Sequence, residues 1–160
     1  MTDLFLKVKI QQGINLPFVI YSKPGSDEIV GLFQSNDHLY HAETFAETGF
    51  VFAPFDGENY VLIPEDYAEI IIEKYEKNAL PEDVNIPKDF EQEAKADFET
   101  LVEKGVAAIQ SGYFQKVVLS RKEKVAVENK ETEHLFNRLL SNYPNAFKYC
   151  FYHPKVGMGM

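Results

Sequence analysis

The feature that most constrains the fold is an amphipathic repeat between residues 90 and 109 that ends at a glycine. Apolar residues recur there at spacings of three and four, with acids and lysines between them, which is the period of a helix that buries one face. Pro87 stands near the start of the repeat and Gly112 just past its end, as expected at the two ends of a helix. Because Gly105 falls on the apolar face, we expect another part of the backbone to approach it closely. The apolar face comprises Phe90, Ala94, Phe98, Leu101, Val102, Gly105, Ala108 and Ile109.

The residues after Gly112 predict a change from helix to sheet. A run rich in β-branched residues, 117–127, predicts a strand, and its first residues do not alternate cleanly between apolar and polar. We therefore expect the start of this strand to be buried on both faces. A second amphipathic helix is predicted around Leu135–Leu140, followed by a strand over 146–152 and a turn over 153–157.

Short strands and turn signals alternate before the long helix. Residues 1–10 suit one or two helical turns, 64–77 favour a helix although Ile70–Ile72 alone would also suit a strand, and 78–88 form a connector. Frequent turns between short strands indicate antiparallel pairing. The sequence thus predicts an α+β fold, an antiparallel sheet with helices on one face. The expected strands are 17–22, 28–34, 39–42, 49–55 and 58–64.

Length and charge narrow the classes of partner. The chain has 160 residues, enough for one domain with a core, and its formal net charge is -9. An acidic chain repels phosphate backbones and anionic lipid, which disfavours nucleic acid and membrane surfaces as partners. The single cysteine, Cys150, lies in an apolar run and suits a buried thiol in a reducing compartment. With no signal peptide at the start, the sequence predicts a cytoplasmic protein.

Most familiar sites are missing from the sequence. It has no phosphate-binding glycine loop, CxxC or HExxH motif. His38 and His41 are three residues apart, but they lie among strand and loop signals without a third ligand at a usual spacing, so loop residues in water are the favoured reading. The acids Glu43 and Glu47 stand at spacings typical of a solvated face.

Lys116 is the strongest candidate for a chemical role. It stands where the predicted turn meets the predicted strand, beside Phe114, Val117 and Val118. Apolar surroundings disfavour a charged ammonium, so a lysine there can supply a neutral amine as a base. The alternative reading places its stem on the sheet rim and its ammonium in water. On pattern alone this alternative is favoured.

A resemblance to a known family changes this balance. The stretch Tyr113–Arg121, with the sequence YFQKVVLSR, resembles the signature strand of the chorismate-utilising enzymes. The helices on both sides of it and the entry to the next strand at Tyr143–Phe147 also follow the family's order of elements. The good resemblance covers about residues 90–160, and the N-terminal strands match loosely.

The resemblance implies a specific activity. Isochorismate and salicylate synthases carry lysine where this sequence has Lys116, whereas anthranilate synthases carry glutamine. It therefore implies an isochorismate synthase that uses Lys116 as the general base for a water molecule attacking C2 of chorismate, in a pathway to menaquinone or a catechol siderophore. Salicylate synthase, which also eliminates pyruvate, is the alternative within the family. The implied substrate is chorismate and the implied cofactor is Mg²⁺.

The C-terminal end of the sequence sets a further expectation. It falls at the return strand of a predicted hairpin, so we expect residues 1–160 to be the N-terminal part of one incomplete domain. The general acid and the magnesium ligands are then expected in a missing second half, and the 160-residue chain alone is expected to be inactive. Self-association through exposed sheet, at the strand 146–152, is an accompanying expectation. The alternative from another class is a self-contained binding or structural module, which light scattering would recognise as a monomer.

Overall fold

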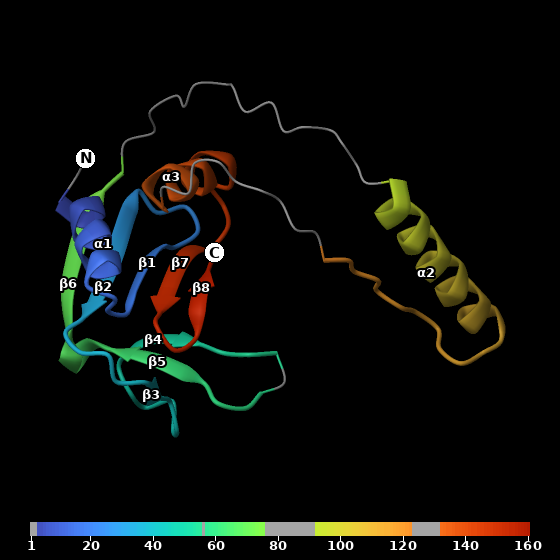
Figure 1. Cartoon of the computed structure of the whole chain (residues 1–160), viewed down its shortest axis with the longest axis horizontal. Coiled ribbons are helices and arrows are strands. Elements are labelled where there is room, and N and C mark those ends of the chain that lie inside the picture. Colours follow the sequence, from blue (N-terminus) through green and yellow to red (C-terminus); the bar gives the residue numbers. More distant parts are fainter. Residues whose placement is uncertain (1–2, 56, 76–91, 123–131) are drawn as a thin grey trace. The chain divides into compact units, whose positions relative to one another are not determined.

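A five-stranded antiparallel sheet organises the larger of two compact units in the chain (Figure 1). The computed structural model describes residues 3–55, 57–75, 92–122 and 132–160. The larger unit, here called the sheet unit, comprises residues 1–80 and 129–160, and the helix unit comprises 81–128. The strand order is β6-β2-β1-β7-β8. The strands are β1 (Phe18–Ser22), β2 (Glu28–Gln34), β6 (Ala68–Lys74), β7 (Lys148–His153) and β8 (Gly157–Gly159).

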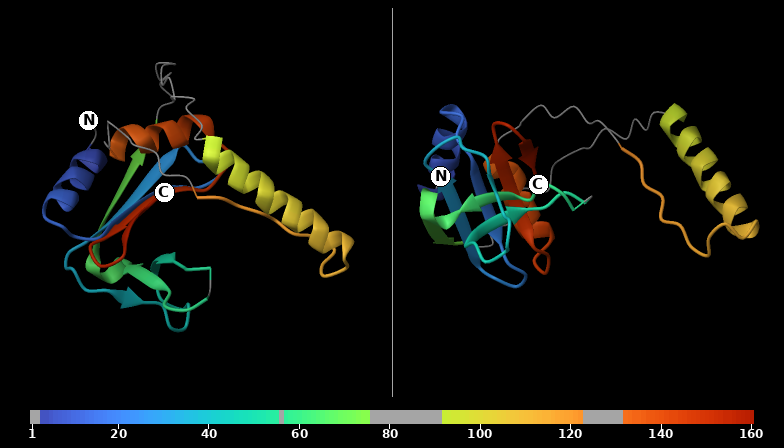
Figure 2. Two further views of the ribbon diagram at one scale, coloured as in Figure 1. Left: turned by 45° about the vertical axis from the view of Figure 1, so that its right-hand side comes forward. Right: turned by 90° about the horizontal axis from the view of Figure 1, so that it is seen from below.

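Two helices cover one face of this sheet (Figures 1 and 2). They are α1 (Asp3–Gly13) and α3 (Thr132–Asn142), and both turn apolar side chains toward the strands. Phe136 of α3 is fully buried and meets the Phe5 ring edge-on at 6.3 Å between centroids. The core on this face consists of Leu4, Phe5, Val8, Phe18, Ile20, Ile29, Phe33, Phe136, Leu140 and Cys150.

A three-stranded sheet covers the opposite face. Its strand order is β3-β5-β4, and the second core lies between the two sheets. Phe52 of β4 stacks on Phe151 of β7 at 4.6 Å between ring centroids. Since both faces of β1 are covered, Phe18 and Ile20 pack under the helices while Val19 packs under the small sheet. The strands of the small sheet are β3 (Tyr40–His41), β4 (Gly49–Phe52) and β5 (Val61–Pro64).

The N-terminal part of the sequence prediction is confirmed. Strands β1 to β5 fall within the predicted runs, and the helical turns expected in residues 1–10 extend to α1. The predicted turn 23–27 closes the β1–β2 hairpin, with Gly25 at φ 71° and a Ser26 N–H donating to the Lys23 carbonyl. A left-handed residue is needed there, which is why the sequence has glycine. The fold class, α+β with helices on one face of an antiparallel sheet, is also confirmed.

The predicted helix over residues 64–77 is wrong. After one turn of 3₁₀ helix, η1 (Glu65–Tyr67), the chain forms strand β6. All seven residues of β6 pair with β2, from Ala68 opposite Gln34 to Lys74 opposite Glu28. Ile71 then packs against the core under the helices, while Ile70 and Ile72 point to the other face. Pairing with a long neighbouring strand outweighs the weak helical spacing.

In the helix unit, the described residues form one long helix and the segment after it. Helix α2 (Gln92–Gln110) confirms the predicted repeat, except that Phe90 and the connector 78–88 lie outside the described residues.

In the sheet unit, the predicted helix around Leu135–Leu140 and the strand over 146–152 are confirmed as α3 and β7. Strand β7 pairs with β1 along its length from Lys148 to Tyr152 and with β8 from Phe151 to His153.

Cys150 should resist thiol reagents while the chain is folded. Its side chain is fully buried, and burial raises the pKa of the thiol to about 12, so it stays protonated at pH 8. Reaction with a disulfide reagent at pH 8 should therefore be slow in buffer and fast in denaturant, with the rate in buffer set by opening of the structure. Equal rates in the two solutions would contradict this burial.

Candidate functional site

Helix α2 ends in a turn, and this turn places the segment Tyr113–Arg121, here called the signature segment, beside the helix. The Gly112 N–H donates to the Ile109 carbonyl and the Tyr113 N–H donates to the Ala108 carbonyl. With Gly112 at φ 78°, these bonds form a Schellman C-cap, which ends the helix and reverses the chain. This cap explains why the sequence has a glycine at position 112, just past the end of the helix.

The signature segment packs against Gly105 of α2. A Cβ added to Gly105 would lie 3.3 Å from Val117 Cγ1 and 3.4 Å from Leu119 Cδ1. The close approach predicted at Gly105 is therefore present, but the prediction that another part of the backbone makes it is wrong, because the contacting atoms belong to side chains. This contact fixes the position of the segment on both sides of Val118.

The size of the Gly105 side chain can test this packing. Gly105→Leu should push Val117 and Leu119 off the helix, because a close-packed site tolerates added methylenes poorly, at a cost of about 1–3 kcal/mol. Gly105→Ala is the control, since its single methyl needs shifts of only tenths of an ångström and improves helix propensity. Methyl NMR of the labelled chain should show Val117 and Leu119 moving to random-coil shifts in Gly105→Leu alone. Unchanged methyl shifts in both variants would refute the contact.

Lys116 lies in this segment and is exposed. Its neighbours Tyr113 and Val118 are also open to solvent, with 81% and 82% of their surfaces accessible. The described residues of the helix unit thus place the lysine next to apolar side chains but do not enclose it. Its role as a base stays a prediction.

The predicted strand over 117–127, buried at its start, is wrong where the structure describes it. Residues 117–122 form no strand, and 123–127 lie outside the described residues. A β-branched run favours an extended backbone, but a strand also needs a neighbouring strand to pair with. In the described part of the helix unit the segment meets only α2, and its side chains pack there instead.

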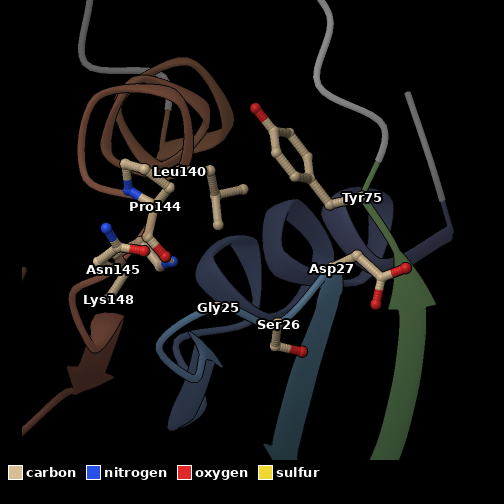
Figure 3. Close-up of a pocket in the computed structure, with 8 residues that line it drawn as sticks. All are labelled: Gly25, Ser26, Asp27, Tyr75, Leu140, Pro144, Asn145 and Lys148. Carbon is tan, nitrogen blue, oxygen red and sulfur yellow. Dashed lines mark hydrogen bonds between the residues drawn. The ribbon is translucent and has the colours of Figure 1, made fainter.

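The sheet unit contains a cavity of about 360 Å³ that sequence reasoning missed (Figure 3). Pro144, Asn145 and Lys148 gather on one side of it, and Tyr75 and Asp27 lie on the opposite side. The predicted turns at 23–27 and 142–144 gave no sign that they would meet. The lining residues are Gly25, Ser26, Asp27, Tyr75, Leu140, Pro144, Asn145 and Lys148.

Hydrogen bonds hold the walls of this cavity together. The Pro144 carbonyl accepts from the Gly25 N–H at 3.1 Å and from Lys148 Nζ at 3.4 Å. The Tyr75 hydroxyl bonds to Ser141 Oγ at 2.8 Å. Lys148 is only 5% exposed, so its charge is held largely out of water. The cavity combines an ammonium, a carboxylate and amide groups with apolar walls, which suits a small polar molecule.

Glu47 and His38, two other polar residues considered in the sequence, make contacts that stabilise the local structure. Glu47 bonds to the backbone N–H groups of Glu43 and Thr44, and backbone bonds to Glu47 itself, Glu43 and Thr44 lower the pKa of the Glu47 carboxyl to about 2. It therefore fastens its own loop. His38 stacks edge-on against Tyr40, at 4.5 Å between ring centroids.

A magnesium site is not found in the described part of the chain. No three histidine, cysteine, aspartate or glutamate side chains gather there as metal ligands could. The described residues thus do not fit the implied Mg²⁺, and no step is assigned to the ion here.

In the same residues, no helix has the length and apolar character needed to cross a membrane.

Comparison with known proteins identifies the family. The family model described as chorismate binding enzyme matches residues 49–158, which include the α2 helix, the Lys116 segment, α3 and β7. The chain therefore belongs to the family of chorismate binding enzymes. The match reaches further toward the N-terminus than the resemblance in the sequence, because it includes β4, β5 and β6. No curated protein and no solved structure matches the chain.

Proposed function

We propose that the chain is part of an isochorismate synthase. Membership of the family makes chorismate the substrate class, and the observation that carries the finer assignment is the lysine at position 116. Anthranilate synthases, which use ammonia as the nucleophile, have glutamine there, by the resemblance described above. A lysine can accept a proton from water, whereas a glutamine amide cannot.

In the proposed reaction Lys116 acts as the general base. Its neutral amine takes a proton from the attacking water as the bond from the water oxygen to C2 forms. The ring double bonds shift and the C4–O bond breaks, so the C4 hydroxyl leaves as water once it receives a proton. Neither the group that supplies this proton nor the ligands of Mg²⁺ are assigned to residues of this chain.

The exposure of Lys116 sets a condition on this proposal. A neutral lysine near pH 7 needs apolar surroundings that remove its water, and the segment from Tyr113 to Val118 is exposed in the helix unit. The proposal therefore requires this segment to be enclosed in the active protein. Closure would also supply the positioning and electrostatic stabilisation that a single base lacks.

Product analysis tests the proposal. The intact protein that contains this chain, incubated with chorismate and Mg²⁺, should form isochorismate without any ammonia source. Salicylate and pyruvate as products would identify a salicylate synthase. Anthranilate or aminodeoxychorismate, formed only when ammonium is added, would overturn water as the nucleophile.

A further inference from the structure

A buried histidine lies where two connections of the sheet unit meet. His153 is the last residue of β7, and its side chain is 0% exposed. The β7–β8 turn that follows it is at the end of the five-stranded sheet next to the small sheet (Figure 1). A histidine this deeply buried needs partners for both ring nitrogens.

The partners of His153 define its neutral tautomer. Nδ1 accepts a hydrogen bond from the Lys155 N–H at 3.1 Å, so it carries no proton. The proton is then on Nε2, which faces the carbonyl oxygen of His38 at 3.4 Å. The first contact orders the β7–β8 turn, in which the Val156 N–H also donates to the His153 carbonyl. The second contact reaches the connection between β2 and β3.

The His38 carbonyl is shared with a second buried side chain. Gln34, at the end of β2, donates from Nε2 to the carbonyls of His38 at 2.7 Å and Asn36 at 2.8 Å. Its Oε1 is buried and has no hydrogen-bond partner among the described residues. A buried acceptor without a partner lowers the free energy of unfolding, so we expect this polar cluster to be weakly stable. The connection it holds is one of the two covalent links between the sheets; the other runs from β5 through η1 to β6.

We propose that His153 is an acid-sensitive latch: protonation of this one imidazole releases both the β7–β8 turn and the β2–β3 connection. A proton on Nδ1 would point at the Lys155 N–H, so two donors would face each other and the turn bond would be lost. Protonation alone would not break the Nε2–H bond to the His38 carbonyl, but the imidazolium would be a buried charge without a carboxylate bonded to it in the described residues. We therefore expect the charged ring to leave its buried position, which breaks the contact with His38 as well. The latch is independent of chorismate chemistry.

Burial and the net effect of the neighbouring charges both disfavour protonation of His153. Burial lowers the pKa of His153 below 6.5, and the positive charges of Lys155 and His41 lower it further. The hydrogen bond to the His38 backbone and the charge of Asp37 act in the opposite direction. Gln34, from β2, brings only an uncharged amide.

The sign of the pH effect follows from this lowered pKa. The unfolded chain takes up the proton first, so the stability due to neutral His153 is complete above about pH 6.5. It is lost as the pH falls from there toward the pKa of the folded state. Over that window the unfolding constant should rise by up to about tenfold per pH unit from this group alone.

The variant His153→Asn separates the latch from the rest of the acid response. An asparagine side-chain oxygen can accept the Lys155 N–H in place of Nδ1, but it cannot be protonated in this range. Denaturant unfolding from pH 7.5 to 5.0 should show the steep loss in the wild-type chain and a shallower one in His153→Asn. His134→Gln, at a partly exposed histidine on α3, is the matched control and should keep the steep loss. Equal slopes in wild type and His153→Asn would overturn the latch.

Measurements on the wild-type chain keep the proposal testable even if the variant does not fold. Nitrogen NMR at pH 7.5 should show His153 protonated at Nε2 alone. On acidification, amide exchange corrected for intrinsic rates should accelerate together at residues 155–158 and 36–40. Protonation of His153 with both segments still protected would refute the latch, as would a His153 pKa at or above 6.5.

Discussion

Lys116→Gln should lower the rate of isochorismate formation by about 10²- to 10⁴-fold in the intact protein, the usual contribution of a general base. The glutamine amide has no basic nitrogen, so the attacking water would have to lose its proton to solvent. Glutamine keeps a polar side chain of similar length at this position, so the melting temperature should change little. Chromatography of the products from chorismate measures the rate, and a thermal melt checks the fold.

Lys122→Gln is the matched control for this prediction. It makes the same change at an exposed lysine six positions further along the same segment. Its rate should remain within a factor of about two of the wild-type rate, since no role in the chemistry is proposed for it. Near-normal turnover in Lys116→Gln, or equal losses in the two variants, would remove Lys116 from the mechanism.

Phe136→Ala should lower the free energy of unfolding of the sheet unit by about 3–5 kcal/mol, the range for a large aromatic removed from a core. The Phe136 ring is fully buried between α3 and the sheet and meets Phe5 edge-on. Its loss leaves a cavity that the packed neighbours can fill only in part. Since domains are stable by about 5–15 kcal/mol, this loss would be a large fraction of the total stability.

Phe55→Ala is the control for the loss of an aromatic ring. Phe55 is fully exposed, so its removal should change the free energy of unfolding by less than about 0.5 kcal/mol. Urea unfolding of both variants, followed by circular dichroism, measures the difference. A loss below about 1 kcal/mol for Phe136→Ala would contradict the packing of α3 on the sheet.

Local signals in the sequence predicted most of the elements correctly. Gly25 and Gly112 marked positions with positive φ, and the apolar repeat before Gly112 marked α2. Where prediction failed, pairing with a distant segment decided the structure. Ile70–Ile72 joined a strand because β2 was available beside them, whereas Val117–Leu119 packed on Gly105. Neither choice is visible in the residues themselves.

The candidate sites were predictable to different degrees. Lys116 could be selected because its neighbours form a motif, but its exposure could not be foreseen. The cavity around Lys148 brings the 23–27 turn against the 144–148 entry to β7, more than a hundred residues away, and no local pattern encodes that meeting. His153 looked like a turn residue, because neither its burial nor its contact with the distant His38 carbonyl can be foreseen from the neighbouring residues.

The most direct test of water as the nucleophile is an isotope experiment. The intact protein would convert chorismate in water enriched in ¹⁸O, and mass spectrometry would locate the label in the product. We predict isochorismate with one ¹⁸O atom, in the hydroxyl at the carbon that was C2 of chorismate, and formation of this product should depend on Lys116. Isochorismate without the label, or no isochorismate at all, would contradict the assignment of Lys116 as the base that activates water.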